Sequence, residues 1–169
     1  MTRDPERPFV VSATIEVPTG TSNKYEMAEG NLVLSRVLYS PVKYPADYGY
    51  IDDTLFDDGD PLDILVVISE PAVPGCRVPA RVVGGLHMTD EKGLDTKILA
   101  VCDVDPRYNH IEHYRDLGQH FLDAMAHFFE VYKTLEGKPV TVGDWFGRDE
   151  AMRLVLASRE RRQAAAARA

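Results

Sequence analysis

The feature that most constrains the fold is a series of short β segments in the first two thirds of the chain, followed only late by helical periodicity. In residues 9–17, Val11, Ala13 and Ile15 alternate with polar residues, as in a half-buried strand. Gly, Pro and Asp turns separate this segment from at least five similar ones, at residues 24–27, 32–38, 64–68, 81–88 and 97–104. This order predicts an α+β, mainly β fold, with a small barrel or curled sheet first and helices last.

Two helices are expected in the C-terminal half of the chain. Between residues 117 and 135, the apolar residues Phe121, Met125 and Phe128 recur at spacings of three or four, which is typical of one helix face. A second helix is expected at about residues 149–166, where Ala, Leu and Val alternate with Arg and Glu. Both helices would pack on the β segments that precede them.

The chain is expected to form a single domain over residues 1–169, because no linker or internal repeat interrupts it. No stretch approaches 18 apolar residues, so no membrane span is expected. Residues 1–8 lack the apolar core of a signal peptide. Cys76 and Cys102 show neither a CxxC nor a Cys/His zinc spacing. Reduced thiols and a cytoplasmic location are therefore expected.

Negative charge is concentrated in the part of the chain that forms the β segments. The net charge is −8, but residues 153–169 hold five Arg and one Glu, so residues 1–152 carry −12. Seven aspartates and no basic residue lie between Asp47 and Asp63. Such a field repels nucleic acid and anionic membranes, so neither is an expected partner. A divalent cation would neutralise it, and an acidic enzyme acting on an anion would need one.

The densest group of carboxylates is Asp58-Gly-Asp-Pro-Leu-Asp63, at the entrance to an apolar strand. Asp, Gly and Pro are also the usual turn formers, so ordinary turn chemistry is the alternative interpretation. An EF-hand is excluded, because position 12 counted from Asp58 is Ser69. Oxygen ligands without His or Cys favour Mg²⁺ or Mn²⁺ over zinc.

A second acidic segment, Asp90-Glu-Lys-Gly-Leu-Asp-Thr-Lys97, has the composition of a hairpin turn between two strands. Asp95 and Lys97 are two residues apart and therefore point to the same face, with Asp90 across the turn. A solvated hairpin tip is the alternative interpretation. Combined with the first group, the segment predicts a site with several cations held by carboxylates.

Several side chains could bind an anion beside these carboxylates. Arg36 shares a strand face with leucines, where a guanidinium is costly unless it meets an anion. The alternative is an arginine that reaches past the sheet edge into water. Lys24 and the pair Tyr132-Lys133 could each be surface residues. Tyr48 could pack in the barrel or donate a hydrogen bond to a phosphate. No P-loop, dinucleotide fingerprint or nucleophile elbow is present.

The group Asp58–Asp63 has the D-x-D-P-x-D form of the soluble family I inorganic pyrophosphatases, and the chain resembles that family over about residues 12–147. Further motifs carry the resemblance in the same order: Ile15-Glu-Val-Pro18, Asn23-Lys-Tyr-Glu26, Arg36, Tyr44-Pro-Ala-Asp-Tyr-Gly-Tyr50, Met88-Thr-Asp-Glu91, Asp95-Thr-Lys97 and His127-Phe-Phe-Glu-Val-Tyr-Lys133. The resemblance implies an OB-like, five-stranded closed β-barrel with helices packed on it. For bacterial members it also implies a homohexamer.

The resemblance further implies the reaction and the residues that perform it. The reaction would be Mg²⁺-dependent hydrolysis of pyrophosphate to two orthophosphates, by direct attack of a metal-activated water or hydroxide, with Mn²⁺ as a substitute ion. Asp60 would be the catalytic base beside the attacking water. The implied metal ligands are Glu16, Glu26, Asp58, Asp63, Asp90 and Asp95. The implied substrate-binding residues are Lys24, Arg36, Tyr48, Lys97, Tyr132 and Lys133. The resemblance assigns no role to His87, for which a place near the metal is one open alternative.

Two other classes of protein share part of this pattern. OB-like barrels often bind oligonucleotides, but they do so with a basic groove interleaved with aromatic residues. A structural Ca²⁺ protein would account for the aspartates alone. It would not require Lys24, Arg36, Lys97 and Lys133, and it would bind metal without releasing phosphate.

Overall fold

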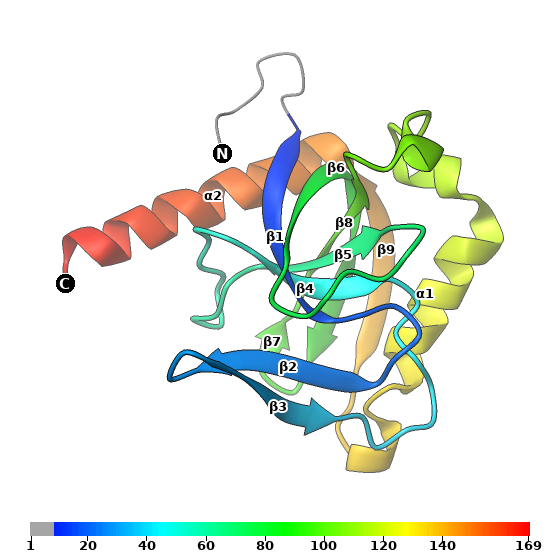
Figure 1. Cartoon of the computed structure of the whole chain (residues 1–169), viewed down its shortest axis with the longest axis horizontal. Coiled ribbons are helices and arrows are strands. Elements are labelled where there is room, and N and C mark those ends of the chain that lie inside the picture. Colours follow the sequence, from blue (N-terminus) through cyan, green and yellow to red (C-terminus); the bar gives the residue numbers. More distant parts are fainter. Residues whose placement is uncertain (1–8) are drawn as a thin grey trace.

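The computed structural model describes residues 9–169, and the expectation that no signal peptide occupies residues 1–8 lies outside them. The helices are α1 (Gln119–Val131) and α2 (Arg148–Ala167), with three short 3-10 helices at Pro106–Tyr108, Tyr114–Leu117 and Thr134–Glu136. The strands are β1 (Val10–Val17), β2 (Asn23–Ala28), β3 (Asn31–Val37), β4 (Asp47–Ile51), β5 (Asp63–Val67), β6 (Arg77–Asp90), β7 (Gly93–Leu94), β8 (Lys97–Cys102) and β9 (Thr141–Gly147). Figure 1 shows α1 and α2 on different sides of the β structure.

Five strands form a ring, which confirms the expected five-stranded barrel. β1 pairs antiparallel with β4, and β4 pairs antiparallel with β5. β5 runs parallel to β8, and β8 pairs antiparallel with β6. The ring is completed by antiparallel pairing of β6 with β1 (Figure 1). The long strand β6 extends beyond the ring and also pairs with β7 and β9.

The strands at the centre of the sheet are buried on both faces. All six residues of β8 are buried, and the side chains from Ile98 to Cys102 alternate between two apolar clusters. Leu99 shares one cluster with Met125 of α1, whereas Ile98 shares the other with Val155 of α2. Because successive side chains of a strand point to opposite faces, one strand contributes to both clusters. This double burial explains the continuous apolar sequence of β8.

The six strands predicted from alternation are confirmed, as are both helices, but β4, β7 and β9 were not anticipated. β4 contains Asp47 and Gly49, and both residue types are disfavoured in strands. Asp47 is fully buried, and its carboxylate accepts hydrogen bonds from Thr19 and from the backbone N–H of Ala72. A Cβ on Gly49 would lie 1.8 Å from the carbonyl oxygen of Thr14. Contacts with other segments therefore outweigh the local preferences in β4.

The β2–β3 hairpin forms a separate two-stranded sheet beside the barrel (Figure 1). All seven residues of β3 are exposed, so the strand face that Arg36 was expected to share with leucines is not part of the core. The large apolar residues of this strand are therefore 42–50% exposed instead of packed in the core. Among residues 9–169, neither helix combines the length and apolar character needed to cross a bilayer.

Candidate active site

A cavity of about 470 Å³ lies where the β2–β3 hairpin, the end of the barrel and the segment after α1 meet. We call residues 52–62, which connect β4 to β5 on its rim, the aspartate loop. Thirteen side chains proposed from the sequence as site residues all line this cavity. They are Glu16, Lys24, Glu26, Arg36, Tyr48, Asp58, Asp60, Asp63, Asp90, Asp95, Lys97, Tyr132 and Lys133.

The buried ammonium group of Lys97 joins two of the carboxylates. The side chain of Lys97 is only 2% exposed. Its Nζ donates to Oδ2 of Asp63 at 2.7 Å, to Oδ1 of Asp95 at 2.8 Å and to the hydroxyl of Tyr48 at 3.0 Å. Burial lowers the pKa of Lys97, but Asp63, Tyr48 and Asp95 outweigh it and hold the pKa well above its ordinary value. Lys97 is therefore charged, and all three of its N–H donors are engaged.

A second carboxylate–ammonium pair lies at the end of β6. Nζ of Lys133 is 3.1 Å from Oδ2 of Asp90 and 4.0 Å from Oε2 of Glu91. Burial opposes ionisation of Asp90, but hydrogen bonds from the backbone N–H of Lys92 and from Lys133 lower its pKa. Lys92 also lines the cavity and was not anticipated as a site residue. Asp90 is thus held as an anion toward the cavity.

On the opposite wall, Lys24 lies between two glutamates. Its Nζ is 3.2 Å from Oε1 of Glu26 and 3.9 Å from Oε2 of Glu16. Lys24 and Glu26 share a strand face, as their spacing of two residues predicts. Burial raises the pKa of Glu16 to about 7, although the nearby Lys24 opposes the shift. At neutral pH, Glu16 is therefore partly protonated while no cation is bound.

The raised pKa of Glu16 predicts a pH-dependent stability in EDTA. Between pH 4.5 and about 7, the folded chain binds more protons at Glu16 than the unfolded chain does. Stability should therefore fall as the pH rises through this window, and Glu16→Gln should remove this contribution, worth at most about 3 kcal/mol. Urea unfolding of both proteins at about pH 5, 6 and 7 measures the difference. If the difference in unfolding free energy between the wild type and Glu16→Gln stayed the same at all three pH values, the prediction would be contradicted.

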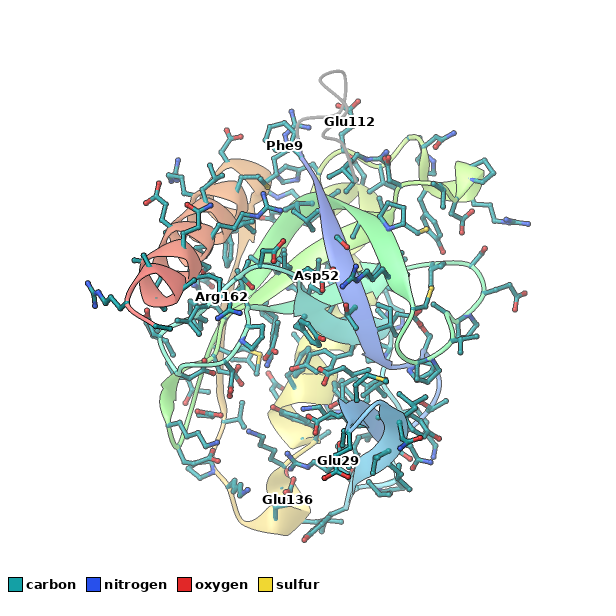
Figure 2. The ribbon with its side chains drawn as sticks, turned by 60° about the vertical axis from the view of Figure 1, so that its left-hand side comes forward. Phe9, Glu29, Asp52, Glu112, Glu136 and Arg162 are labelled. Atoms are coloured by element: carbon teal, nitrogen blue, oxygen red, sulfur yellow. The ribbon has the colours of Figure 1, made fainter. Side chains whose placement is uncertain are left out.

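Arg36 is oriented by a residue that the sequence did not reveal as part of the site. Its Nη2 donates to Oε1 of Glu136, in the 3-10 helix after α1, one hundred residues further along the chain. The Glu136 side chain is 7% exposed, and its Oε2 is buried without a hydrogen-bond partner among residues 9–169. Figure 2 shows Glu136 at the same end of the molecule as Glu29, at the tip of the β2–β3 hairpin. A glutamate before Gly137 resembles an ordinary helix end, so no local pattern marks it.

Asp58 and Asp60 lie in a tight turn of the aspartate loop. The backbone N–H of Asp60 donates to Oδ1 of Asp58 at 2.9 Å, and the N–H of Phe56 donates to the carbonyl of Asp60 at 2.7 Å. Gly59 has a φ of +86°, which glycine adopts at little cost. Within the described part of the chain, no basic side chain forms an ion pair with Asp58 or Asp60. Both carboxylates remain available to ligands in the cavity.

The donor set of the cavity fits a hard divalent cation. Among residues 9–169, no three His, Cys, Asp or Glu side chains are arranged as a ready metal cage. Instead, the ammonium groups of Lys24, Lys97 and Lys133 lie between the carboxylates. Mg²⁺ typically keeps several waters and binds through only a few carboxylates, so an open set of oxygens suits it. The described residues that line the cavity include no His or Cys, and a set of carboxylate oxygens also fits Mn²⁺.

His87 does not line the cavity, which argues against the place near the metal that the sequence left open for it. Its Nε2 lies 2.9 Å from Oε1 of Glu150, in the first turn of α2. Its ring packs on Phe146 of β9, with 4.3 Å between the ring centroids. β6 turns this side chain away from the site because His87 alternates with the buried residues Leu86 and Met88.

The chain is similar to proteins of known family over nearly its whole length. The family model described as "Inorganic pyrophosphatase" matches residues 13–163. The inorganic pyrophosphatase of Geobacillus stearothermophilus is 49% identical over 148 residues, covering 86% of this chain and 90% of the relative. The inorganic pyrophosphatase of Halalkalibacterium halodurans is 49% identical over 150 residues, covering 88% of this chain and 92% of the relative. The crystal structure of the inorganic pyrophosphatase from Thermus thermophilus superposes with a TM-score of 0.89 at 43% identity, covering 96% of this chain and 97% of that one.

Proposed function

Because the chain belongs to the inorganic pyrophosphatase family, whose members hydrolyse pyrophosphate, we propose that it performs this reaction with Mg²⁺ and by direct attack of water. The observation that supports this mechanism is the cavity, where carboxylates and cationic side chains face the same space. Carboxylates suit divalent cations, whereas Lys and Arg suit phosphoryl oxygens. Pyrophosphate binding requires both kinds of group, because the substrate and the site are both anionic.

The carboxylates proposed to hold Mg²⁺ are Glu16, Glu26, Asp58, Asp63, Asp90 and Asp95. When bound, the cations would lower the pKa of a water and neutralise charge on the phosphoryl groups. Mn²⁺ is the substitute ion that the same oxygen donors would accept. Proton release from Glu16 would accompany cation binding near neutral pH, because its pKa is about 7 in the absence of a cation.

Asp60 is the residue we assign to the proton of the attacking water. As the water oxygen bonds to one phosphorus, the bond from that phosphorus to the bridging oxygen breaks. The carboxylate of Asp60 accepts the proton, and the bridging oxygen leaves with the second phosphate. Asp60 suits this role because it lines the cavity and forms no ion pair within residues 9–169. No covalent enzyme intermediate is required.

The phosphoryl groups are assigned to Lys24, Arg36, Tyr48, Lys97, Tyr132 and Lys133. Arg36 keeps further guanidinium donors free after it pairs with Glu136, so it can still bind a phosphoryl oxygen. Lys97 differs, because Asp63, Asp95 and Tyr48 occupy all its donors. A phosphoryl oxygen would have to replace one of these acceptors. We infer that Lys97 would have a donor free for substrate if Asp63 or Asp95 bound a cation instead of Lys97.

Phosphate release from pyrophosphate by the purified chain, measured with millimolar Mg²⁺ and with excess EDTA, tests the function. Rapid release that EDTA abolishes is the expected result. Release that continues in EDTA would contradict the Mg²⁺ requirement. If no divalent ion supports release, the proposed activity is wrong for this chain.

We also propose that the chain forms a homo-oligomer, in line with the homohexamer that the family resemblance implies. The β2–β3 hairpin exposes a group of large apolar side chains, and such a surface is typical of an interface. They are Met27, Leu32, Val33, Leu34 and Val37. Sedimentation velocity should show a species several times heavier than the 18.9 kDa chain. A single species with the mass of one chain, 18.9 kDa, would contradict the proposal.

The cytoplasmic location and the single domain over residues 1–169 remain predictions. Cys76 and Cys102 are free thiols in the structure, and this is compatible with a reducing compartment. Cys76 is exposed and Cys102 is buried. Labelling of the native protein with a thiol reagent should therefore modify Cys76 first.

A further inference from the structure

The aspartate loop is hydrogen-bonded to the C-terminal helix on the side away from the cavity. The backbone N–H of Leu55 donates to the carbonyl of Ser158 in α2 at 2.9 Å. Nη1 of Arg161 lies 2.8 Å from Oδ1 of Asp57 and 3.3 Å from the carbonyl oxygen of Leu55. In Figure 1, α2 runs alongside the connection between β4 and β5 that forms this loop.

An apolar contact region supports these polar contacts. Phe56 and Leu62 of the loop belong to the same buried cluster as Met152 and Val155 of α2. Ser158, whose carbonyl accepts from Leu55, is itself only 2% exposed. The start and end of the loop are therefore fixed against the helix and the barrel. Its tip projects beyond this region, toward the cavity.

The tip of the aspartate loop has few restraints from other parts of the chain. The hydrogen bonds of Gly59 and Asp60 are made to residues within the loop. Asp57 is paired with Arg161, and it directly precedes Asp58. Among residues 9–169, Arg161 thus makes the ion pair that links the tip to a distant element. A shift of Asp57 would move Asp58 and Asp60 with it.

We propose that α2 is a positioning element of the active site and that Arg161, through Asp57 and Leu55, holds the aspartate loop so that Asp58 is placed for cation binding and Asp60 for its role as base. The inference rests on the proposed function in taking these two aspartates as site residues. Arg161 and Asp57 are both partly exposed, and such pairs contribute modestly to stability. The effect of Arg161 is therefore on the geometry of the loop more than on the stability of the fold.

The sign of the effect separates positioning from simple electrostatics. Arg161 is a positive charge near a cation site, so its removal on electrostatic grounds alone would tighten cation binding. Loss of positioning would weaken binding, because the loop would have to be ordered when the cation binds. Arg161→Gln therefore gives opposite results under the two explanations.

Calorimetric titration of the full-length, metal-free protein with Mg²⁺, and separately with Mn²⁺, tests the proposal without substrate. Arg161→Gln should weaken the affinity about two- to fivefold, the range of an exposed ion pair. Arg161→Lys, which keeps the charge, should recover part of the loss. Arg162→Gln is the matched control, since it removes the same charge from the adjacent, exposed residue labelled in Figure 2. Its affinity should be unchanged or slightly tighter.

The proposal would be overturned if Arg161→Gln bound the cation as tightly as the wild type or more tightly. It would also be overturned if Arg162→Gln lost as much affinity as Arg161→Gln. A wild-type chain that binds neither ion would overturn it too. Thermal unfolding in EDTA should give similar midpoints for the three variants, and a large loss in Arg161→Gln alone would show a structural role instead. The phosphate-release assay is independent of these titrations. Failure of the proposed activity can therefore be distinguished from failure of the positioning role.

Discussion

Asp60→Asn is expected to lower kcat for pyrophosphate hydrolysis by about 10²- to 10⁴-fold, the range for loss of a general base. The amide has nearly the same shape as the carboxylate but does not accept the proton of the attacking water. The turn should persist, because the hydrogen bonds that define it use the backbone of Asp60 and the side chain of Asp58. Initial rates at saturating Mg²⁺ and pyrophosphate measure the effect.

Asp53→Asn is the matched control for this substitution. Asp53 lies in the same loop but does not line the cavity, and it has a φ of 60°, which Asn tolerates as well as Asp. Its turnover should stay close to wild type. Calorimetry with Mg²⁺ should show that Asp60→Asn retains cation binding. If turnover stayed near wild type in Asp60→Asn, the base would be another group.

Lys97→Met is expected to produce the largest loss of stability among the site residues. Removing the buried ammonium leaves Asp63 and Asp95 facing each other without a cation, and breaking a buried pair of this kind costs about 3–5 kcal/mol. Mg²⁺ should restore more stability to the variant than to the wild type, because it supplies the missing positive charge. Urea unfolding in EDTA and in Mg²⁺ measures both effects.

Lys43→Met provides the control for loss of an ammonium group elsewhere. Lys43 is exposed and, within residues 9–169, donates a hydrogen bond to Ser22 alone, so its replacement should change stability by less than about 0.5 kcal/mol. Lys97→Met should also lower activity, since Lys97 lines the cavity. Unfolding curves in EDTA that coincide for Lys97→Met and the wild type would show that Asp63 and Asp95 do not depend on this ammonium.

Motifs, strand alternation and the family resemblance predicted many of the side chains that line the cavity, but not Lys92. The groups around Asp58 and Asp95 and the family resemblance identified thirteen side chains that line one cavity. Local spacing also predicted that Lys24 and Glu26 point to one face, as do Asp95 and Lys97, and in the structure each of these pairs forms an ion pair. Residues two apart in a strand share a face whatever the rest of the fold does.

Long-range pairing determined the features that sequence reasoning missed. The strand β4 forms although Asp47 and Gly49 disfavour it, because Thr19 and Ala72 bind the Asp47 carboxylate and the backbone of Thr14 closely approaches Gly49. His87 resembled a site residue, but the register of β6 directs it to Glu150 on α2. In each case, the deciding partner lies in a segment remote in sequence.

Neighbours along the chain were thus enough to predict both helices, six of the strands, the acidic motifs and the side chains that share one strand face. Only the tertiary structure decided that Glu136 orients Arg36, that Lys97 joins Asp63 to Asp95, and that α2 holds the aspartate loop. The physical reason is that strand register and helix packing bring together residues one hundred or more positions apart. No local periodicity encodes which of them will meet.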